Sequence, residues 1–328
     1  TGPWQIDVYR HFDFFNIAGG MPDAEFGNWS RKVEAGETVV SFPVAVTCIQ
    51  GGVDEAFGRI ATRCVKEQTF GNADAEELPI MFNEFCTTWG HPYPKALKPE
   101  IKCSKKLGVK YFILDDGWFE KLGDWAEIKE REYPGGFGKF INEIRQAGFV
   151  PGIWFEMEHC LYNSHLREHT ELLLKKNGKP FESSGRYILD MRKPAARKYL
   201  DNTMVKIIRD YGIGYIKVDY NTSFVGADTQ NGTPGIAVAE YLEAVKKYFL
   251  HLKKLFPELV IEVCASGGHR MTNEWLRIGD VHSISDVHET LAIPIVAANA
   301  IRHVPMSKAQ IWSTIRPDND AARLSYLI

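Results

Sequence analysis

From residue 78 onward, short apolar runs alternate with longer amphipathic stretches. The runs are bounded by Gly, Pro or charged residues, as expected of buried strands, and the stretches repeat apolar residues at helical spacing. The expected strands are 80–85, 111–115, 149–155, 187–189, 214–218, 259–264, 281–285 and 309–313. The expected helices are 96–107, 138–147, 165–176, 195–210, 237–255, 273–278 and 291–303. This alternation over about 250 residues predicts an α/β fold, a (β/α)8 TIM barrel, rather than a doubly wound open sheet, because no GxGxxG follows the first strand.

The first 52 residues lack helical periodicity and predict the end of an N-terminal β-sandwich. Aromatic and β-branched residues gather at 11–15 and 38–46, separated by turn signals. A linking helix from residue 53 to about 70 and a boundary at 71–74 are expected next, so that 53–77 precedes a barrel at 78–328. The chain starts without Met and stops inside an apparent helix at 320–327. We therefore expect a fragment whose last barrel helix is truncated and which lacks a C-terminal β domain.

Composition excludes several classes of function. The formal net charge is -3 and no basic stripe is present, which argues against a nucleic-acid partner. No stretch reaches 18 consecutive apolar residues, so no membrane span is expected. The six cysteines form no CxxC pair and no zinc-type spacing, and this usage leans toward the cytoplasm without fixing the location.

Polar and aromatic residues stand where nearly every predicted strand ends. In a (β/α)8 barrel these ends meet on one rim and build the active site. The rim residues expected from the sequence are Asn83, Asp115 to Trp118, Trp154 to Glu158, Asp190, Lys217, Asp219, Cys264 to Arg270, and Asp286. Such a convergence predicts a pocket.

Two carboxylates of this rim suit covalent catalysis. Lys217 and Asp219 project from the same face of one strand, and the ammonium keeps the carboxylate ionised, as a nucleophile requires. The alternative is a strand-end Asp219 that caps the next loop. Asp286 stands two strands further on, where a general acid could flank the same bond. Residues 286–289 also fit a capping box for the helix at 291, and the two roles can coexist.

Other rim residues suit the recognition of a sugar. Asp115 and Asp116 offer acceptors for hydroxyl groups, and Trp118 and Trp154 offer flat apolar faces, although buried tryptophans are more often core residues. Gly267, followed by a second glycine, permits a ligand to approach the backbone closely. No metal site and no cofactor are expected, because Glu156, Glu158 and His159 more often orient their neighbours than bind a cation. The serine-hydrolase elbow GxSxG is absent around Ser266.

Together the motifs resemble glycoside hydrolase family 36, the melibiase-type α-galactosidases. The segments that carry the resemblance occur in the family's order: 114–119, 152–158, 188–194, 216–221, 262–270 and 285–286. The resemblance implies that Asp219 is the nucleophile and Asp286 the acid/base. It also implies substrate contacts for Asp115, Asp116, Trp118, Trp154, Arg186, Lys217, Cys264, Gly267, His269 and Arg270.

Three departures from the family pattern lie on the fifth to seventh strands. Val218 replaces a Trp, His269 replaces a Gly, and 283–289 differ around Asp286. These changes fit either a pocket for a 2-acetamido group or a reshaped leaving-group subsite. The expected function is a retaining exo-α-glycosidase that releases terminal galactose or N-acetylgalactosamine from oligosaccharides or glycoconjugates. The alternatives are a transglycosylase of raffinose-synthase type, a non-catalytic carbohydrate-binding barrel and a metal-dependent barrel hydrolase.

Overall fold

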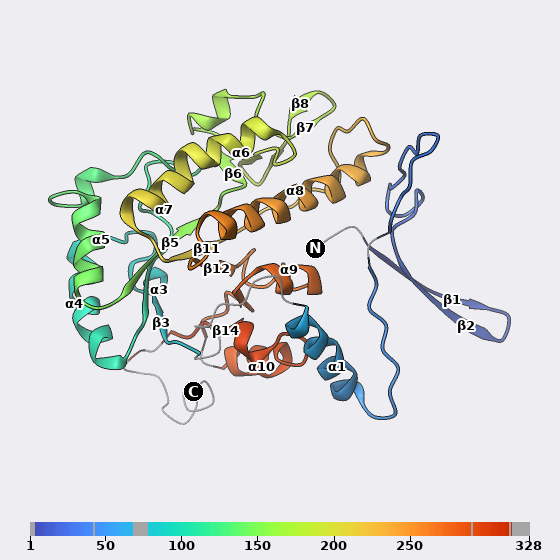
Figure 1. Ribbon diagram of the computed structural model, residues 1–328, viewed down its shortest axis with the longest axis horizontal. Coiled ribbons are helices and arrows are strands. Elements are labelled where there is room, and N and C mark those ends of the chain that lie inside the picture. The colour runs from blue at the N-terminus through green and yellow to red at the C-terminus, as the bar shows by residue number, and fades with distance from the viewer. Residues whose placement is uncertain (1–3, 42, 68–77, 290, 315, 317–328) are drawn as a thin grey trace.

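The computed structural model describes residues 4–41, 43–67, 78–289, 291–314 and 316. Helices surround a central sheet, and an N-terminal hairpin projects away from this body (Figure 1). The boundary expected at 71–74 and the helix expected at 320–327 lie outside the described residues.

A parallel sheet of seven strands forms the centre of the described chain. Its strand order is β14-β13-β12-β11-β5-β4-β3. The strands are β3 (Met81–Asn83), β4 (Tyr111–Leu114), β5 (Val150–Phe155), β11 (Tyr215–Val218), β12 (Val260–Val263), β13 (Val281–Ser283) and β14 (Ala309–Gln310). All neighbouring pairs are parallel. This arrangement confirms the prediction of a TIM-barrel-like α/β fold.

The two faces of this sheet have different roles. Successive side chains of a strand point to opposite faces. Ile216 and Val218 join the main apolar core, which also contains residues of the surrounding helices. Tyr215 belongs to a second, smaller cluster on the other face, and Lys217 lies on that same face by alternation. The inner face therefore carries the charged residues toward the ends of the strands.

Six of the seven predicted helices of the barrel are present. The segment expected at 195–210 is one helical run in which α6 and α7 flank the π-helical turn η4. The helices are α3 (Phe85–Thr88), α4 (Pro94–Ser104), η1 (Lys105–Leu107), η2 (Glu130–Glu132), α5 (Phe137–Gln146), α6 (Pro194–Leu200), η4 (Asp201–Val205), α7 (Lys206–Tyr211), α8 (Pro234–Leu255), α9 (Asn273–Ile278), α10 (Ile293–Ala300) and η5 (Met306–Lys308). Among the described residues, no helix has the length and apolar content that crossing a bilayer requires.

The helix predicted at 165–176 is wrong. Only η3 (Leu166–Glu168) forms there, with the carboxylate of Asp124 accepting the backbone N–H groups of His165 and Leu166. The apolar run that suggested a helix is extended instead. Leu173 bridges to Leu189, and the N–H of Leu174 donates to the carbonyl of Ile188 at 2.8 Å. Periodicity alone does not distinguish such a run from a helical face.

The strand predicted at 187–189 exists but is not part of the barrel sheet. It is β10 (Arg186–Ile188), which pairs antiparallel with β6 (His159–Leu161) and β9 (Glu182–Ser183). Because β5 pairs directly with β11, this small sheet is an excursion between them, with the hairpin β7 (Lys175–Lys176) and β8 (Lys179–Pro180). An apolar run of three residues does not show which strand it pairs with, or whether the pairing is parallel or antiparallel.

The N-terminal residues form less sheet than predicted. β1 (Gln5–His11) and β2 (Phe14–Gly20) make one antiparallel hairpin, on which Val8 and Ile17 pair and are both exposed. Residues 38–46 form no strand within the part of the segment that the structure describes. A helix is present where the linking helix is predicted, α1 (Val53–Lys66), next to which Arg277 of α9 binds the carbonyl of Glu67. The division into 1–52, 53–77 and 78–328 stays a prediction.

Candidate active site

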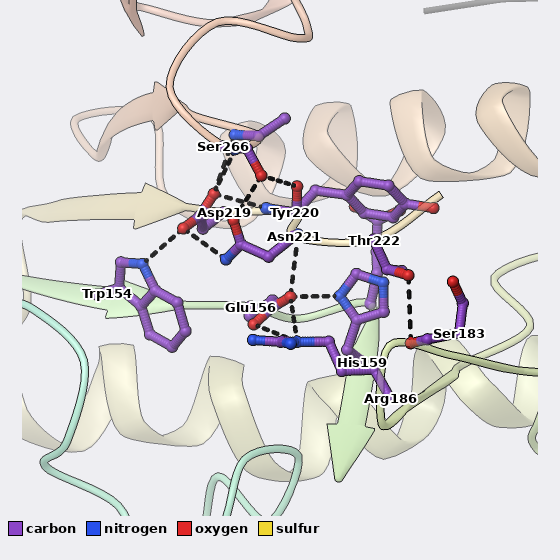
Figure 2. Close-up of polar contacts among 12 residues, drawn as sticks. Trp154, Glu156, His159, Ser183, Arg186, Asp219, Tyr220, Asn221, Thr222 and Ser266 are labelled. Atoms are coloured by element: carbon purple, nitrogen blue, oxygen red, sulfur yellow. Dashed lines mark hydrogen bonds and ion pairs between the residues drawn. The ribbon is translucent and has the colours of Figure 1, made fainter. Parts of the chain in front are cut away.

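Asp219 lies directly after β11 and receives five hydrogen bonds (Figure 2). Its Oδ1 accepts the backbone N–H groups of Tyr220, Ala265 and Ser266 at 2.8, 3.1 and 3.0 Å. Its Oδ2 accepts the Asn221 amide at 2.8 Å and the Trp154 indole at 3.4 Å. Burial by itself would raise the pKa of Asp219, but the charge of Lys217 and these donors hold that pKa below its usual value. The carboxylate is therefore ionised and fixed in orientation.

The turn after β12 holds this carboxylate. Ala265 and Ser266 have positive φ angles of 80° and 47°, which bring their successive N–H groups to one point. Such a concave pair of N–H groups is an anion-binding arrangement. Backbone strain of this kind is commonly stored at functional sites.

The same turn touches the Asp286 segment. Gly267 has φ +87°, and a Cβ at this position would lie 2.4 Å from the backbone N of Asp286. The close approach predicted for Gly267 is therefore made by the protein's own backbone. The segments that bear Asp219 and Asp286 are consequently linked through one short turn.

Asp286 is an exposed residue on the rim. Partial desolvation and the neighbouring Asp219 carboxylate raise its pKa, while Lys217 and His269 act in the opposite direction. The alternative capping box at 286–289 is wrong, because α10 starts later, with Ala292 as its N-cap and no side-chain cap. The side chain of Asp286 is thus left available for chemistry.

Lys217 connects the nucleophile candidate to β4, which is separated from β11 by β5. Its buried ammonium donates to Asp115 Oδ2 at 3.0 Å. The same Oδ2 atom accepts the Asn83 amide at 2.5 Å. Asp115 is therefore held by two donors from two strands, which fixes it on the inner face of the sheet.

Two further acidic groups surround Asp115. Burial, together with the charges of Asp115 and Glu156, raises the pKa of Asp116 to about 6. Glu84, which follows β3, accepts the backbone N–H of Asp115 at 2.8 Å. Burial raises the pKa of Glu84 to about 8, so it is largely protonated at neutral pH. Glu84 is not among the residues predicted from the sequence, although its place after the first barrel strand resembles that of the other rim residues.

Glu156 forms a second centre next to the first (Figure 2). Its Oε1 accepts the backbone N–H of Asn221 at 3.0 Å and lies 3.0 Å from Arg186 Nε. His159 Nδ1 lies 2.8 Å from the same oxygen, without the alignment of a hydrogen bond. Arg186 comes from the excursion strand β10, so that strand positions the loop that bears Asn221. Asn221 was not selected from the sequence, because nothing local shows where its amide points.

The two tryptophans differ in what they offer a ligand. Trp118 is fully buried among other aromatic rings, and its indole donates to the carbonyl of Trp154 at 3.0 Å. It has no exposed face for a sugar, contrary to the prediction. Trp154 is 3% exposed, and its indole N–H donates to Asp219. The edge of the ring that carries this N–H therefore faces the site.

Arg270 and Cys264 are also buried. The Arg270 guanidinium binds both oxygens of Glu158, at 2.6 and 2.8 Å, and lies over the ring of Tyr220. Arg270 is therefore occupied by contacts with Glu158 and with Tyr220, the residue next to Asp219. This differs from the substrate contact predicted for Arg270. Burial and the nearby Asp219 charge raise the pKa of the Cys264 thiol well above its usual value. His269, by contrast, is exposed at the rim.

Among the described residues, one cluster has the side chains of a metal site: Asp124, Glu127 and His165. Both oxygens of Asp124 already accept backbone N–H groups, and His165 Nδ1 lies 2.7 Å from Glu127 Oε1. These contacts account for the cluster as a cap of η3.

Comparison with solved structures supports the fold. Over 82% of this chain and 39% of the other, it is similar to the glycoside hydrolase family 36 alpha-galactosidase AgaB from Geobacillus stearothermophilus, with 22% identity and a TM-score of 0.71. A variant of AgaA from the same organism, in complex with 1-deoxygalactonojirimycin, gives 20% identity and a TM-score of 0.73 over 84% of this chain and 40% of the other.

Curated relatives are alpha-galactosidases. Alpha-galactosidase Mel36A from Lactobacillus acidophilus is 33% identical over 58% of this chain and 28% of its own length. Alpha-galactosidase 1 from Pediococcus pentosaceus is 28% identical over 79% of this chain and 36% of its own length. The chain therefore spans about a third of the length of these relatives. The Melibiase family model matches residues 44–325, which is most of the chain, and the chain therefore belongs to the Melibiase family of glycoside hydrolases.

Proposed function

We propose that the protein is a retaining α-galactosidase that acts on terminal α-linked galactose. The observation that carries this proposal is that five donors fix the Asp219 carboxylate on the rim, and that the turn which supplies two of them contacts the backbone of Asp286. The pKa of Asp219 is lowered, as a nucleophile requires, and the pKa of Asp286 is raised, as a general acid requires. The names of the curated relatives supply the sugar.

The mechanism follows from these two groups. Asp219 attacks the anomeric carbon and forms a covalent glycosyl ester, while Asp286 gives its proton to the departing glycosidic oxygen. Asp286, now a carboxylate, removes a proton from water, and this water breaks the ester with a second inversion. Because Oδ1 of Asp219 is held by three backbone N–H groups, we assign the attack to Oδ2, which is held only by side chains.

The sugar's hydroxyl groups would meet Asp115 and Asp116 at the end of β4. Asp115 is fixed by Lys217 and Asn83 and offers its remaining lone pairs. Relatives have been solved with stachyose and raffinose, which makes galactosyl oligosaccharides the first natural substrates to test.

The choice between galactose and N-acetylgalactosamine depends on fewer residues than the sequence suggested. Val218 is 1% exposed and lies in the main core, on the face opposite Lys217 and Asp219. Its smaller size compared with Trp therefore does not open space on the face that carries Lys217 and Asp219. His269 remains as the exposed rim residue that could contact a 2-acetamido group, and it supports α-N-acetylgalactosaminidase activity as the second candidate.

The test uses full-length protein with aryl α-galactoside and aryl α-N-acetylgalactosaminide, and Asp219→Ala as the blank. We expect turnover of the galactoside, with the α-anomer as the first product by NMR. Azide should restore Asp219→Ala activity as a β-galactosyl azide and Asp286→Ala activity as an α-galactosyl azide. Dominant turnover of the acetamido substrate would favour the second candidate. Transfer of the galactosyl group to added sucrose in place of water would favour a transglycosylase. Binding of the sugar without cleavage would refute catalysis.

A further inference from the structure

Trp312, which follows β14, reaches the inner face of the sheet at Lys217. The Lys217 ammonium lies 4.3 Å from the centre of the Trp312 ring. Trp312 is 8% exposed and Lys217 is 3% exposed, so this cation–π contact is shielded from water. Contacts of this kind are strongest where the cation has lost its hydration shell.

The same tryptophan spans the open edge of the sheet. Among the described residues, β14 and β3 are the two outermost strands and do not pair with each other. The Trp312 indole N–H donates to the Cys86 sulfur at 3.3 Å, and Cys86 belongs to α3, directly after β3. Trp312 therefore joins the last strand of the sheet to the first.

Several acidic groups compete for the ammonium of Lys217. Its side chain is long, and three acidic groups act on its ammonium: Asp115 directly after β4, Asp219 directly after β11, and Glu262 on β12. The hydrogen bond to Asp115 is directional, but the pull of the other two carboxylates competes with it. A ring face over the ammonium adds a further attraction and excludes water from it.

We infer that Trp312 is a positioning residue for Lys217, and that it sets where the ammonium sits between Asp115 and Asp219. Trp312 touches neither carboxylate in any contact described above, so it acts on both through Lys217. The catalytic part of this inference rests on the proposed function. The part that concerns Lys217 itself does not.

Three variants of the full-length protein separate the ring from the N–H group. Trp312→Phe keeps a ring face and loses the N–H, Trp312→Leu loses both, and Cys86→Ala removes only the sulfur acceptor. Thermal unfolding verifies that each variant folds, and Trp312→Met, whose unbranched side chain adapts more easily to an irregular space, is used in place of Trp312→Leu if that variant does not.

Labelling of Lys217 is the readout that needs no substrate. Reductive methylation at neutral pH, followed by peptide mass spectrometry, measures how accessible and how deprotonated the amine is. We expect several-fold faster labelling in Trp312→Leu, and labelling close to wild type in Trp312→Phe and Cys86→Ala. Unchanged labelling in Trp312→Leu would overturn the inference, whether or not the protein cleaves galactosides.

Kinetics on an aryl α-galactoside is the second readout. We expect kcat/KM to fall about tenfold in Trp312→Leu, the size of one shielded cation–π contact, and its acid limb to move to higher pH because Asp219 loses part of its counter-charge. Trp312→Phe should restore most of both effects. If Cys86→Ala reproduced the loss, closure of the sheet rather than the ring face would be responsible. A wild-type protein that cleaves no galactoside but shows the labelling pattern would refute the proposed function alone.

Discussion

Replacing Asn221 by Ala removes one of the two side-chain donors to Asp219 Oδ2, at 2.8 Å. A hydrogen bond to a charged group contributes about 1.5–3 kcal/mol, and one pKa unit corresponds to about 1.4 kcal/mol. The donor stabilises the ionised carboxylate in particular, so its loss should raise the pKa of Asp219 by about one to two units. Water that enters the space replaces part of the bond, and we expect a value near one unit.

The pH dependence of kcat/KM on an aryl α-galactoside measures this shift, because it reports the groups of the free enzyme. The acid limb should move to higher pH by about one unit in Asn221→Ala. Thr222→Ala is the matched control: it is the next residue, and its hydroxyl donates to the carbonyl of Ser183 rather than to Asp219. Ser266→Ala, which loses a 2.7 Å bond to Asn221 Oδ1, should give a smaller shift.

Stability should change in the same variant with a defined sign. The folded pKa of Asp219 lies below its unfolded value, so the group stabilises the fold above the unfolded pKa, and this contribution is lost as pH falls through the folded pKa. Asn221→Ala should therefore lower the free energy of unfolding at pH 7 by about 1–2 kcal/mol and by less in strong acid. An acid limb that superimposes on that of the wild type would refute the role given to Asn221.

Two further substitutions test the surroundings of the site. Gly267→Ala places a Cβ 2.4 Å from the backbone N of Asp286 at φ +87°, and urea unfolding should show a loss of roughly 2–4 kcal/mol. Gly178→Ala has a similar φ of +74° with nothing within 4 Å, so an equal loss there would contradict the clash. Glu84→Gln should leave stability unchanged near pH 4 and raise it by roughly 2–4 kcal/mol at pH 8, because wild-type Glu84 must stay protonated in the fold while the unfolded chain ionises. Equal pH profiles of urea unfolding for both proteins would contradict the raised pKa.

The sequence predicted the barrel well because its strands are buried on both faces. Runs such as 111–115 and 259–264 are apolar, short and bounded by polar residues, which is the pattern of a parallel sheet covered by helices. The same reasoning located the rim, since chemistry gathers where such strands end. The predictions for 165–176 and 187–189 were wrong. These residues belong to an excursion of short antiparallel strands, whose apolar residues are as frequent as those of a helix or a barrel strand.

The sequence showed which residues lie at the site better than it showed the contacts that they make there. Asp219, Lys217 and Asp115 stand out as charges at strand ends, but the amide of Asn221 and the ring of Trp312 do not. Glu156, 65 positions away, accepts the backbone N–H of Asn221 and so helps to place its amide beside Asp219, and the role of Trp312 depends on the strand of Lys217, which is also distant in the sequence. Arg270 illustrates the converse, because a charged residue in a glycine-rich motif turned out to be buried against Glu158.

The backbone of the turn at 265–268 contacts both the carboxylate of Asp219 and the segment that bears Asp286. Two of its N–H groups bind Asp219, and its third residue packs on the backbone of Asp286. A non-glycine residue at positive φ costs about 1–3 kcal/mol, and this turn contains two of them, Ala265 and Ser266. A buried carboxylate without partners would cost more than either, so binding Asp219 offsets the strain. Because the turn is held at both ends, a shift of one carboxylate moves the backbone beside the other. The backbone of this turn thus links the two segments, and the exposed His269 acts on the pKa of Asp286 through its charge rather than through this link.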